Sequence, residues 1–172
     1  IKIFIFFGFI FCGFLSFAQG TFFLDSNGVT VKCTGCAAGD TGVVGGQLYT
    51  AHDNTTINAK PKGASDWNRV VTSLVTDTSN LFKNKTTFNQ DISSWDMSNV
   101  TNMNEMFRDA LSFNQSLNNW DVSSVTSMIR MFALTSGLDH KFNNGASPGA
   151  SGTLNWDTSS VTNMNGMFAP QG

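Results

Sequence analysis

Two cysteines separated by two residues, Cys33 and Cys36 in the segment CTGC, have the residue type and spacing best suited to chemistry. A CxxC pair can be redox-active, can form half of a metal site, or can close a local disulfide. No second CxxC follows in the sequence, and His52 and His140 stand alone. We therefore favour a local disulfide, as in proteins of an oxidising compartment, and assign no metal and no cofactor.

Aspartates form a second candidate set because they recur with a serine two residues later. The pairs are Asp96 and Ser98, Asp121 and Ser123, and Asp157 and Ser159. A row of carboxylates on an exposed face could bind a hard cation. Alternatively, each aspartate accepts a hydrogen bond from the backbone N–H near its serine and closes a turn. We favour the turn, since a calcium site usually needs more carboxylates than one per turn.

Catalysis has no other support in the sequence. We find no nucleophile with a neighbouring base, no phosphate-binding loop and no metal-ligand spacing, so the chain is not predicted to be an enzyme. Catalysis could still reside in a C-terminal part that the sequence lacks. The 172 residues suit one domain, with 41% hydrophobic and 13% charged residues. A net charge of -2 gives no sign of a nucleic-acid partner.

The N-terminal segment IKIFIFFGFIFCGFLSFAQG has the features of a signal peptide. Lys2 precedes an apolar run that is short for a membrane span, and Ser16-Phe17-Ala18 fits a cleavage site. We expect residues 1–18 to be removed and the mature chain to begin at Gln19, secreted or at the cell surface, without a membrane span. A membrane anchor is the alternative. Because the sequence starts at Ile1 and stops soon after a repeated Met-Phe, we expect a fragment.

Three similar lines of sequence occupy the C-terminal half. They are FNQDISSWDMSNVTNMNEMF from Phe88, FNQSLNNWDVSSVTSMIRMF from Phe113, and LNWDTSSVTNMNGMF ending at Phe168. Aligned, they give apolar columns: Trp95, Trp120 and Trp156; Val100, Val125 and Val161; Met103, Met128 and Met164; Met106, Met131 and Met167; Phe107, Phe132 and Phe168. A faded copy with Val75 and Phe82 precedes them. Such units bury their apolar faces only by stacking, so Trp120 should lie between Trp95 and Trp156.

The spacing inside a unit predicts a leucine-rich-repeat-like solenoid of short parallel strands and helical turns. Ile92, Trp95 and Met97 follow an LxxLxL pattern, and Leu117, Trp120 and Val122 repeat it. The segment MNEMFRDA should form a short helix or helical turn. We expect about three and a half repeats in residues 66–172. Residues 19–65 should form a small N-terminal β cap, with strands at GVTVKC and QLYTAHD and an exposed loop or linker at NAKPKGASD.

Over about Val70 to Phe168, the pattern W-[DN]-x-S-x-V-T-x-M-x-x-M-F resembles the 26-residue repeat of bacterial surface proteins, which is related to BspA-like leucine-rich repeats. The resemblance implies an exported or cell-surface bacterial protein with a solenoid fold. It also implies a role in adhesion or protein binding. Residues 21–60 do not share the repeat.

In an LxxLxL strand the x positions face outward, which defines a candidate binding face for an extracellular protein or glycan. Its residues are Ser94, Asp96, Ser98, Asn99, Asn119, Asp121, Ser123, Ser124, Asn155, Asp157, Ser159 and Ser160. We call this set the polar face. It is mildly acidic and has no aromatic residue, so each contact should be weak and many copies would be needed. The alternatives are a passive spacer of a larger surface protein or the non-catalytic part of an enzyme.

Two further expectations concern the ends and edges of the stack. Asn89, Asn114 and Asn143 follow a phenylalanine in each unit and should bond the backbone of the next unit as an asparagine ladder. The last unit should leave Trp156, Val161, Met164 and Phe168 uncovered, because a stack exposes one face of its final unit.

Overall fold

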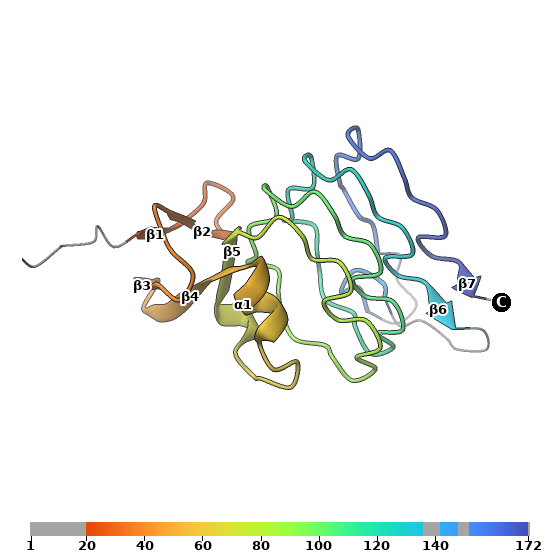
Figure 1. The fold of residues 1–172 in the computed structure, drawn as a ribbon, viewed down its shortest axis with the longest axis horizontal. Helices are drawn as coiled ribbons and strands as arrows, with labels where there is room; N and C mark the ends of the chain where they lie inside the picture. Colours follow the sequence, from red (N-terminus) through yellow and green to blue (C-terminus); the bar gives the residue numbers. More distant parts are fainter. Residues whose placement is uncertain (1–19, 136–141, 148–151, 172) are drawn as a thin grey trace, which may run out of the picture.

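The computed structural model describes residues 20–135, 142–147 and 152–171 (Figure 1). The expected signal peptide, residues 1–18, and the expected new terminus at Gln19 lie outside the described residues. Most of the chain that is described is irregular backbone, with small sheets and a large aromatic core.

Small strands build the N-terminal part, two of them at the predicted segments GVTVKC and QLYTAHD and two that the sequence did not predict. Strands β1 (Thr21–Leu24) and β2 (Val31–Thr34) form one antiparallel hairpin, and β3 (Thr41–Val44) and β4 (Gln47–Asp53) form another. Strand β4 also pairs in parallel with β5 (Val70–Leu74). This pairing joins the hairpins to the repeats. Figure 1 shows both hairpins at one end of the stack of repeats.

A short helix, α1 (Asn54–Ala59), follows β4 where the sequence suggested only strand and loop. Its first turn is held by a capping box, in which the Asp53 carboxylate accepts from the Thr56 N–H and the Thr56 hydroxyl oxygen accepts from the Asp53 N–H. The predicted loop NAKPKGASD therefore begins inside α1. The 3-10 helix η1 (Trp67–Arg69) leads from that loop into β5.

Equivalent contacts recur in four units of the described chain, which we call coils 1 to 4: residues 64–88, 89–113, 114–142 and 143–171. Figure 1 shows them as loops lying side by side, from yellow-green to blue. Single parallel bridges link equivalent residues of successive coils, namely Asp77, Asn102, Ser127 and Asn163. Strands β6 (Leu134–Thr135) and β7 (Pro170–Gln171) extend this parallel pairing between coils 3 and 4.

Aromatic columns run through the coils, as the alignment predicted. The ring centroids of Trp95 and Trp120 are 6.2 Å apart, and those of Trp120 and Trp156 are also 6.2 Å apart. The rings of Phe107 and Phe132 stack at 5.5 Å. Trp120 is 3% exposed, so the prediction that it lies buried between two tryptophans is confirmed.

The three stacked tryptophans, Trp95, Trp120 and Trp156, also donate their indole N–H groups to the preceding coil. The Trp120 Nε1–H donates to the Ile92 carbonyl at 3.0 Å, and the Trp95 Nε1–H donates to the Trp67 carbonyl at 3.0 Å. Trp67 stands 25 residues before Ile92, and both carbonyls accept the same kind of bond, so the two residues occupy equivalent positions in coils 1 and 2. The faded first copy is thus in register with the others, although it keeps only Val75 and Phe82 of their aligned columns.

The backbone differs from the predicted strand and helical turn. Segments with the LxxLxL pattern form turns, closed by bonds such as Trp95 N–H to the Ile92 carbonyl at 3.2 Å, and the parallel bridges lie later in each coil. The segment MNEMFRDA also forms turns, because Glu105 (φ 55°) and Asp109 (φ 57°) adopt left-handed conformations that interrupt a helix. The residue of coil 4 that is equivalent to Glu105 is Gly166 (φ 62°), which adopts the left-handed conformation without strain.

Candidate functional site

The polar face lies on the turns around each tryptophan rather than on a strand. Eight of its members are exposed: Asn99, Asp121, Ser123, Ser124, Asn155, Asp157, Ser159 and Ser160. Three others, Ser94, Ser98 and Asn119, are half-buried. Asp96 is 3% exposed, so the expected outward position is wrong for this residue. The accessible face is therefore concentrated on coils 3 and 4.

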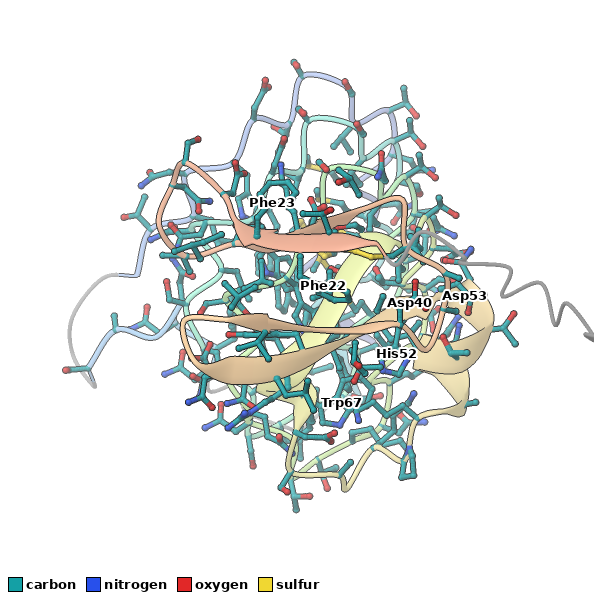
Figure 2. All side chains as sticks on the ribbon, turned by 90° about the vertical axis from the view of Figure 1, so that its left-hand side faces the viewer. Phe22, Phe23, Asp40, His52, Asp53 and Trp67 are labelled. Atoms are coloured by element: carbon teal, nitrogen blue, oxygen red, sulfur yellow. A yellow bond between two sulfur atoms is a disulfide. The ribbon has the colours of Figure 1, made fainter. Side chains whose placement is uncertain are left out.

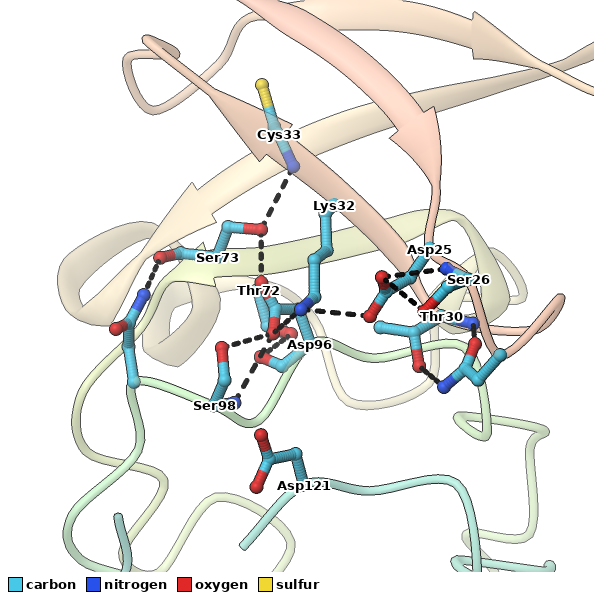
Figure 3. Close-up of polar contacts among 12 residues, drawn as sticks. Asp25, Ser26, Thr30, Lys32, Cys33, Thr72, Ser73, Asp96, Ser98 and Asp121 are labelled. Carbon is cyan, nitrogen blue, oxygen red and sulfur yellow. Dashed lines mark hydrogen bonds and ion pairs between the residues drawn. The ribbon is translucent and has the colours of Figure 1, made fainter. Parts of the chain in front are cut away.

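Asp96 is buried because the N-terminal part covers coil 2 (Figure 3). Its carboxylate accepts from the Ser73 hydroxyl at 2.6 Å and lies 4.0 Å from the Lys32 Nζ. Its carbonyl accepts from the Thr72 hydroxyl at 2.7 Å. Lys32 also pairs with Asp25 at 2.9 Å, and this contact chiefly raises the pKa of Lys32. These bonds attach β2, and β5 of coil 1, to coil 2.

The turn interpretation of the aspartates is confirmed. Asp121 accepts from the Ser123 N–H at 3.1 Å and from the Ser123 hydroxyl at 2.6 Å. Asp96 contacts Ser98 in the same way. Asp157 accepts from the N–H two residues later, at 3.0 Å, and this bond holds the Asp157 pKa below its ordinary value. One carboxylate oxygen of each aspartate is thus committed to its own turn.

The asparagine ladder is also confirmed. The Asn89 side-chain oxygen accepts from the Asn114 N–H at 2.8 Å, and the Asn114 side-chain oxygen accepts from the Asn143 N–H. Gln115 adds a bond from its Nε2 to the Asn89 carbonyl at 3.0 Å. These amides join the coils at the edge that follows each buried phenylalanine.

Cys33 and Cys36 form a disulfide at the end of β2. Cys33 is buried against Val31 and Val71, and its N–H donates to the Ser73 hydroxyl at 3.0 Å. Across the described part of the chain, no three His, Cys, Asp or Glu side chains are grouped as a metal site would require. His52, labelled in Figure 2, is half-buried, and burial lowers its pKa.

Sequence reasoning missed an open cavity of about 550 Å³ between the loop after α1 and the end of coil 1. Its lining comes from Lys62, Gly63 and residues 84–90. The Lys62 ammonium lies 5.1 Å from the centre of the Trp67 ring, and burial, with Lys85 and Lys60 adding charge repulsion, lowers its pKa to about 8. The faded sequence of coil 1 gave no repeat signature at residues 62–64 that could have revealed this cavity.

Apolar side chains are exposed at both ends of the described chain. At the N-terminal end, Phe23, Leu24, Val43 and Leu48 are exposed on the two hairpins, and Figure 2 shows Phe23 on the near face. On coil 4, Phe168 is 60% exposed and Met164 is 40% exposed, as expected, whereas Trp156 and Val161 are half-buried.

Coils in register around aromatic columns define a protein built from repeated units. The chain belongs to the family described as "Mycoplasma protein of unknown function, DUF285", whose model matches residues 47–168. That match includes β4, α1, coils 1 to 3 and coil 4 as far as Phe168, and the family description indicates a bacterial source. No curated protein and no solved structure matches the chain. Within the described residues, no helix has the length and apolar character needed to cross a bilayer.

Proposed function

We propose that this chain is the binding region of a secreted or cell-surface protein, without catalytic activity. In this proposal the coils form a leucine-rich-repeat-like solenoid related to the 26-residue repeat of bacterial surface proteins. The parallel bridges, the aromatic columns and the asparagine ladder support it, because each contact joins equivalent positions of neighbouring units. The ligand is an extracellular protein or glycan.

The observation that carries the proposal is the repeated row of exposed polar groups on coils 3 and 4. Asp121 and Asp157 each use Oδ1 to close a turn, while Oδ2 has no hydrogen-bond partner among the described residues. Ser124 and Ser160 are exposed at matching positions. Identical groups spaced by one coil can contact successive units of an extended ligand, with weak individual contacts that add up.

A screen of glycan and extracellular-protein arrays with a multimerised form of the protein tests this role. The variant Asp121→Asn/Ser124→Ala/Asp157→Asn/Ser160→Ala removes the free oxygens, while each asparagine can still accept the turn hydrogen bond. Thr55→Ala, at an exposed side chain of α1, is the control. We expect a ligand that the wild type and the control retain and that the quadruple variant loses. Equal binding by all three proteins would reject the polar face as the binding surface.

A passive spacer is the second candidate function, and the shared geometry of the coils favours it over an enzyme fragment. A spacer needs only the stacked core and a solvated surface, which coils 2 and 3 both have. In that case the multimerised protein would bind nothing on either array.

A further inference from the structure

The cavity beside coil 1 lies where the repeat loses one side chain. Gln115 donates to the Asn89 carbonyl at 3.0 Å, and Gln90, which is 25 residues earlier, donates in the same way to the Ala64 carbonyl. Ala64 therefore occupies the position that Asn89 has in coil 2 and Asn114 has in coil 3. Since alanine has no side-chain oxygen, coil 1 starts the asparagine ladder without its first acceptor.

Two backbone N–H groups beside the cavity are left without a protein acceptor, one of them because of Ala64. The Asn114 N–H is bound by the Asn89 side chain at 2.8 Å, and the Ser112 N–H is bound by the Thr86 carbonyl at 3.0 Å. The groups 25 residues earlier are the N–H groups of Asn89, at the start of coil 2, and of Thr87, near the end of coil 1, and neither has an acceptor among the described residues. The stacking register places both N–H groups opposite residues 61–64, the segment whose Lys62 and Gly63 line the cavity.

The carbonyl that would bind the Thr87 N–H is engaged elsewhere. Pro61 stands 25 residues before Thr86, but its carbonyl accepts from the Ala64 N–H at 2.9 Å and closes a local turn. The loop after α1 therefore does not pair with the end of coil 1 in the way that coil 1 pairs with coil 2. This departure opens the cavity next to the two N–H groups.

The cavity also concentrates positive charge. Lys62 and Lys85 line it, no acidic residue does, and neither lysine forms an ion pair in the part of the chain that the structure describes. Lys60 lies nearby but pairs with Asp66 at 2.7 Å. Lys62 is held in place by bonds from its Nζ to the carbonyls of Ile57 and Asn58, both at 3.0 Å.

We propose that this cavity binds the carboxylate or sulfate group of an acidic saccharide. The anion supplies the acceptors that coil 1 lacks, taking hydrogen bonds from the N–H groups of Thr87 and Asn89 and pairing with the charges of Lys62 and Lys85. Backbone N–H groups and ammonium groups together form strong, charge-assisted contacts with such oxygens. The site lies apart from the polar face and does not depend on it.

A saccharide fits the rest of the cavity better than a free ion or an apolar group. The volume of about 550 Å³ exceeds that of one small anion. The walls carry amides and hydroxyls from Asn84, Thr86 and Gln90, which suit sugar hydroxyls. Phe88, the aromatic residue of the lining, is 5% exposed and packs into the core, so it offers little apolar surface.

The test is an amide-resolved NMR titration of the full chain, as processed by the expressing host, with three probes: glucuronate, glucose and sodium sulfate. We expect glucuronate to shift the Thr87 and Asn89 resonances at lower concentration than sulfate does, and glucose to leave them unchanged. Equal effects of glucuronate and sulfate would mean an adventitious anion site only and would overturn the proposal that the ligand is a saccharide. If glucose shifted the same resonances as strongly as glucuronate does, the proposal that the acidic group of the ligand is recognised would be overturned.

The repeat itself provides a sharp variant, Ala64→Asn, which supplies the missing acceptor for the Asn89 N–H and so competes with the anion for it. We expect it to reduce glucuronate affinity by about tenfold or more, with Ala59→Asn as the matched control. Lys85→Met, at an exposed side chain without an ion pair, should cause a similar loss without affecting the fold, with Arg130→Asn as its control. Unchanged affinity in folded Ala64→Asn, or in Lys85→Met, would overturn the proposal.

Discussion

Asp96, Asp121 and Asp157 close the same turn in successive coils but differ in their surroundings. Asp96 is covered by β2 and β5 and contacts Ser73 and Lys32, whereas the other two are exposed. A residue type that repeats along the sequence therefore has one structural role in every coil and an additional role in coil 2. That additional role attaches the N-terminal hairpins.

Replacing the buried aspartate should be more costly than replacing its exposed equivalents. Asp96→Ala leaves the Ser73 hydroxyl and the Lys32 charge without their partner, so we expect a loss of about 2–3 kcal/mol in the free energy of unfolding. Asp121→Ala should lose only about 0.5–1 kcal/mol, since it removes only a turn bond. Urea denaturation of both variants measures the difference. Similar losses would mean that the contacts of β2 and β5 with Asp96 contribute nothing.

Lys62 gives the protein a predictable response to alkaline pH. Its pKa is about 8 in the folded protein, mainly because of burial, and near 10.5 when unfolded, so the unfolded chain binds more protons between these values. The free energy of unfolding should therefore rise with pH from about 8 to about 10. Because Lys62 is partly exposed, the gain should stay below about 1 kcal/mol. Urea melts of wild type and Lys62→Met across this range test it; parallel pH profiles would contradict it.

At the scale of the element, each coil is a set of turns joined to its neighbours by side chains. The tryptophan column shows this most clearly, because each ring stacks on the next and each indole N–H bonds the preceding coil. Regular strands are nearly absent between β5 and β6 in the described chain. Coil geometry is consequently fixed by the columns and by left-handed turn residues such as Glu105 and Arg130.

Trp120→Ala should reduce the free energy of unfolding by about 3–5 kcal/mol, the usual cost of removing a large buried aromatic side chain. It also leaves the Ile92 carbonyl without its donor. Trp156→Ala should cost less, since Trp156 is half-buried on coil 4. Chemical denaturation of both variants provides the comparison. A loss below about 1 kcal/mol for Trp120→Ala would show that the column does not stabilise the fold.

The columns were predictable from the sequence because identical residues recur at constant offsets. The backbone inside a coil was not, since the LxxLxL spacing of Ile92, Trp95 and Met97 fits a turn as well as a strand. Helix α1 was missed because Asn54 to Ala59 is short and depends on its Asp53 cap. The cavity at Ala64 could not be found either, because it arises from a residue that departs from the repeat.

At the scale of the whole molecule, stability is a sum of contacts between neighbouring coils. Coils 2 and 3 have a neighbour on both sides, and most of their apolar residues are fully buried. Coil 4, by contrast, leaves the side chains of Met164 and Phe168 exposed. We therefore expect the coils to open unequally.

Hydrogen exchange should be slowest between Trp95 and Met128 and fastest in coil 4. The amides of Met164, Gly166 and Phe168 have no acceptor among the described residues, whereas their equivalents in coil 3 are bound. Exchange measured by mass spectrometry or NMR at neutral pH tests this order. Uniform protection across coils 2 to 4 would show that coil 4 is covered in solution, and light scattering would then tell whether a second copy covers it.

The 25-residue register between coils 1 and 2 also bears on how such a gene can change. In the described chain the hydrogen bonds between coils join neighbouring units, so Phe88 could be followed directly by Asn114 with the same kinds of partners in the adjacent coils. Unequal recombination that removes or duplicates one whole unit would thus preserve the tryptophan column and the asparagine ladder. Relatives of this protein can differ in copy number, and so in length and reach, without having to evolve a new core.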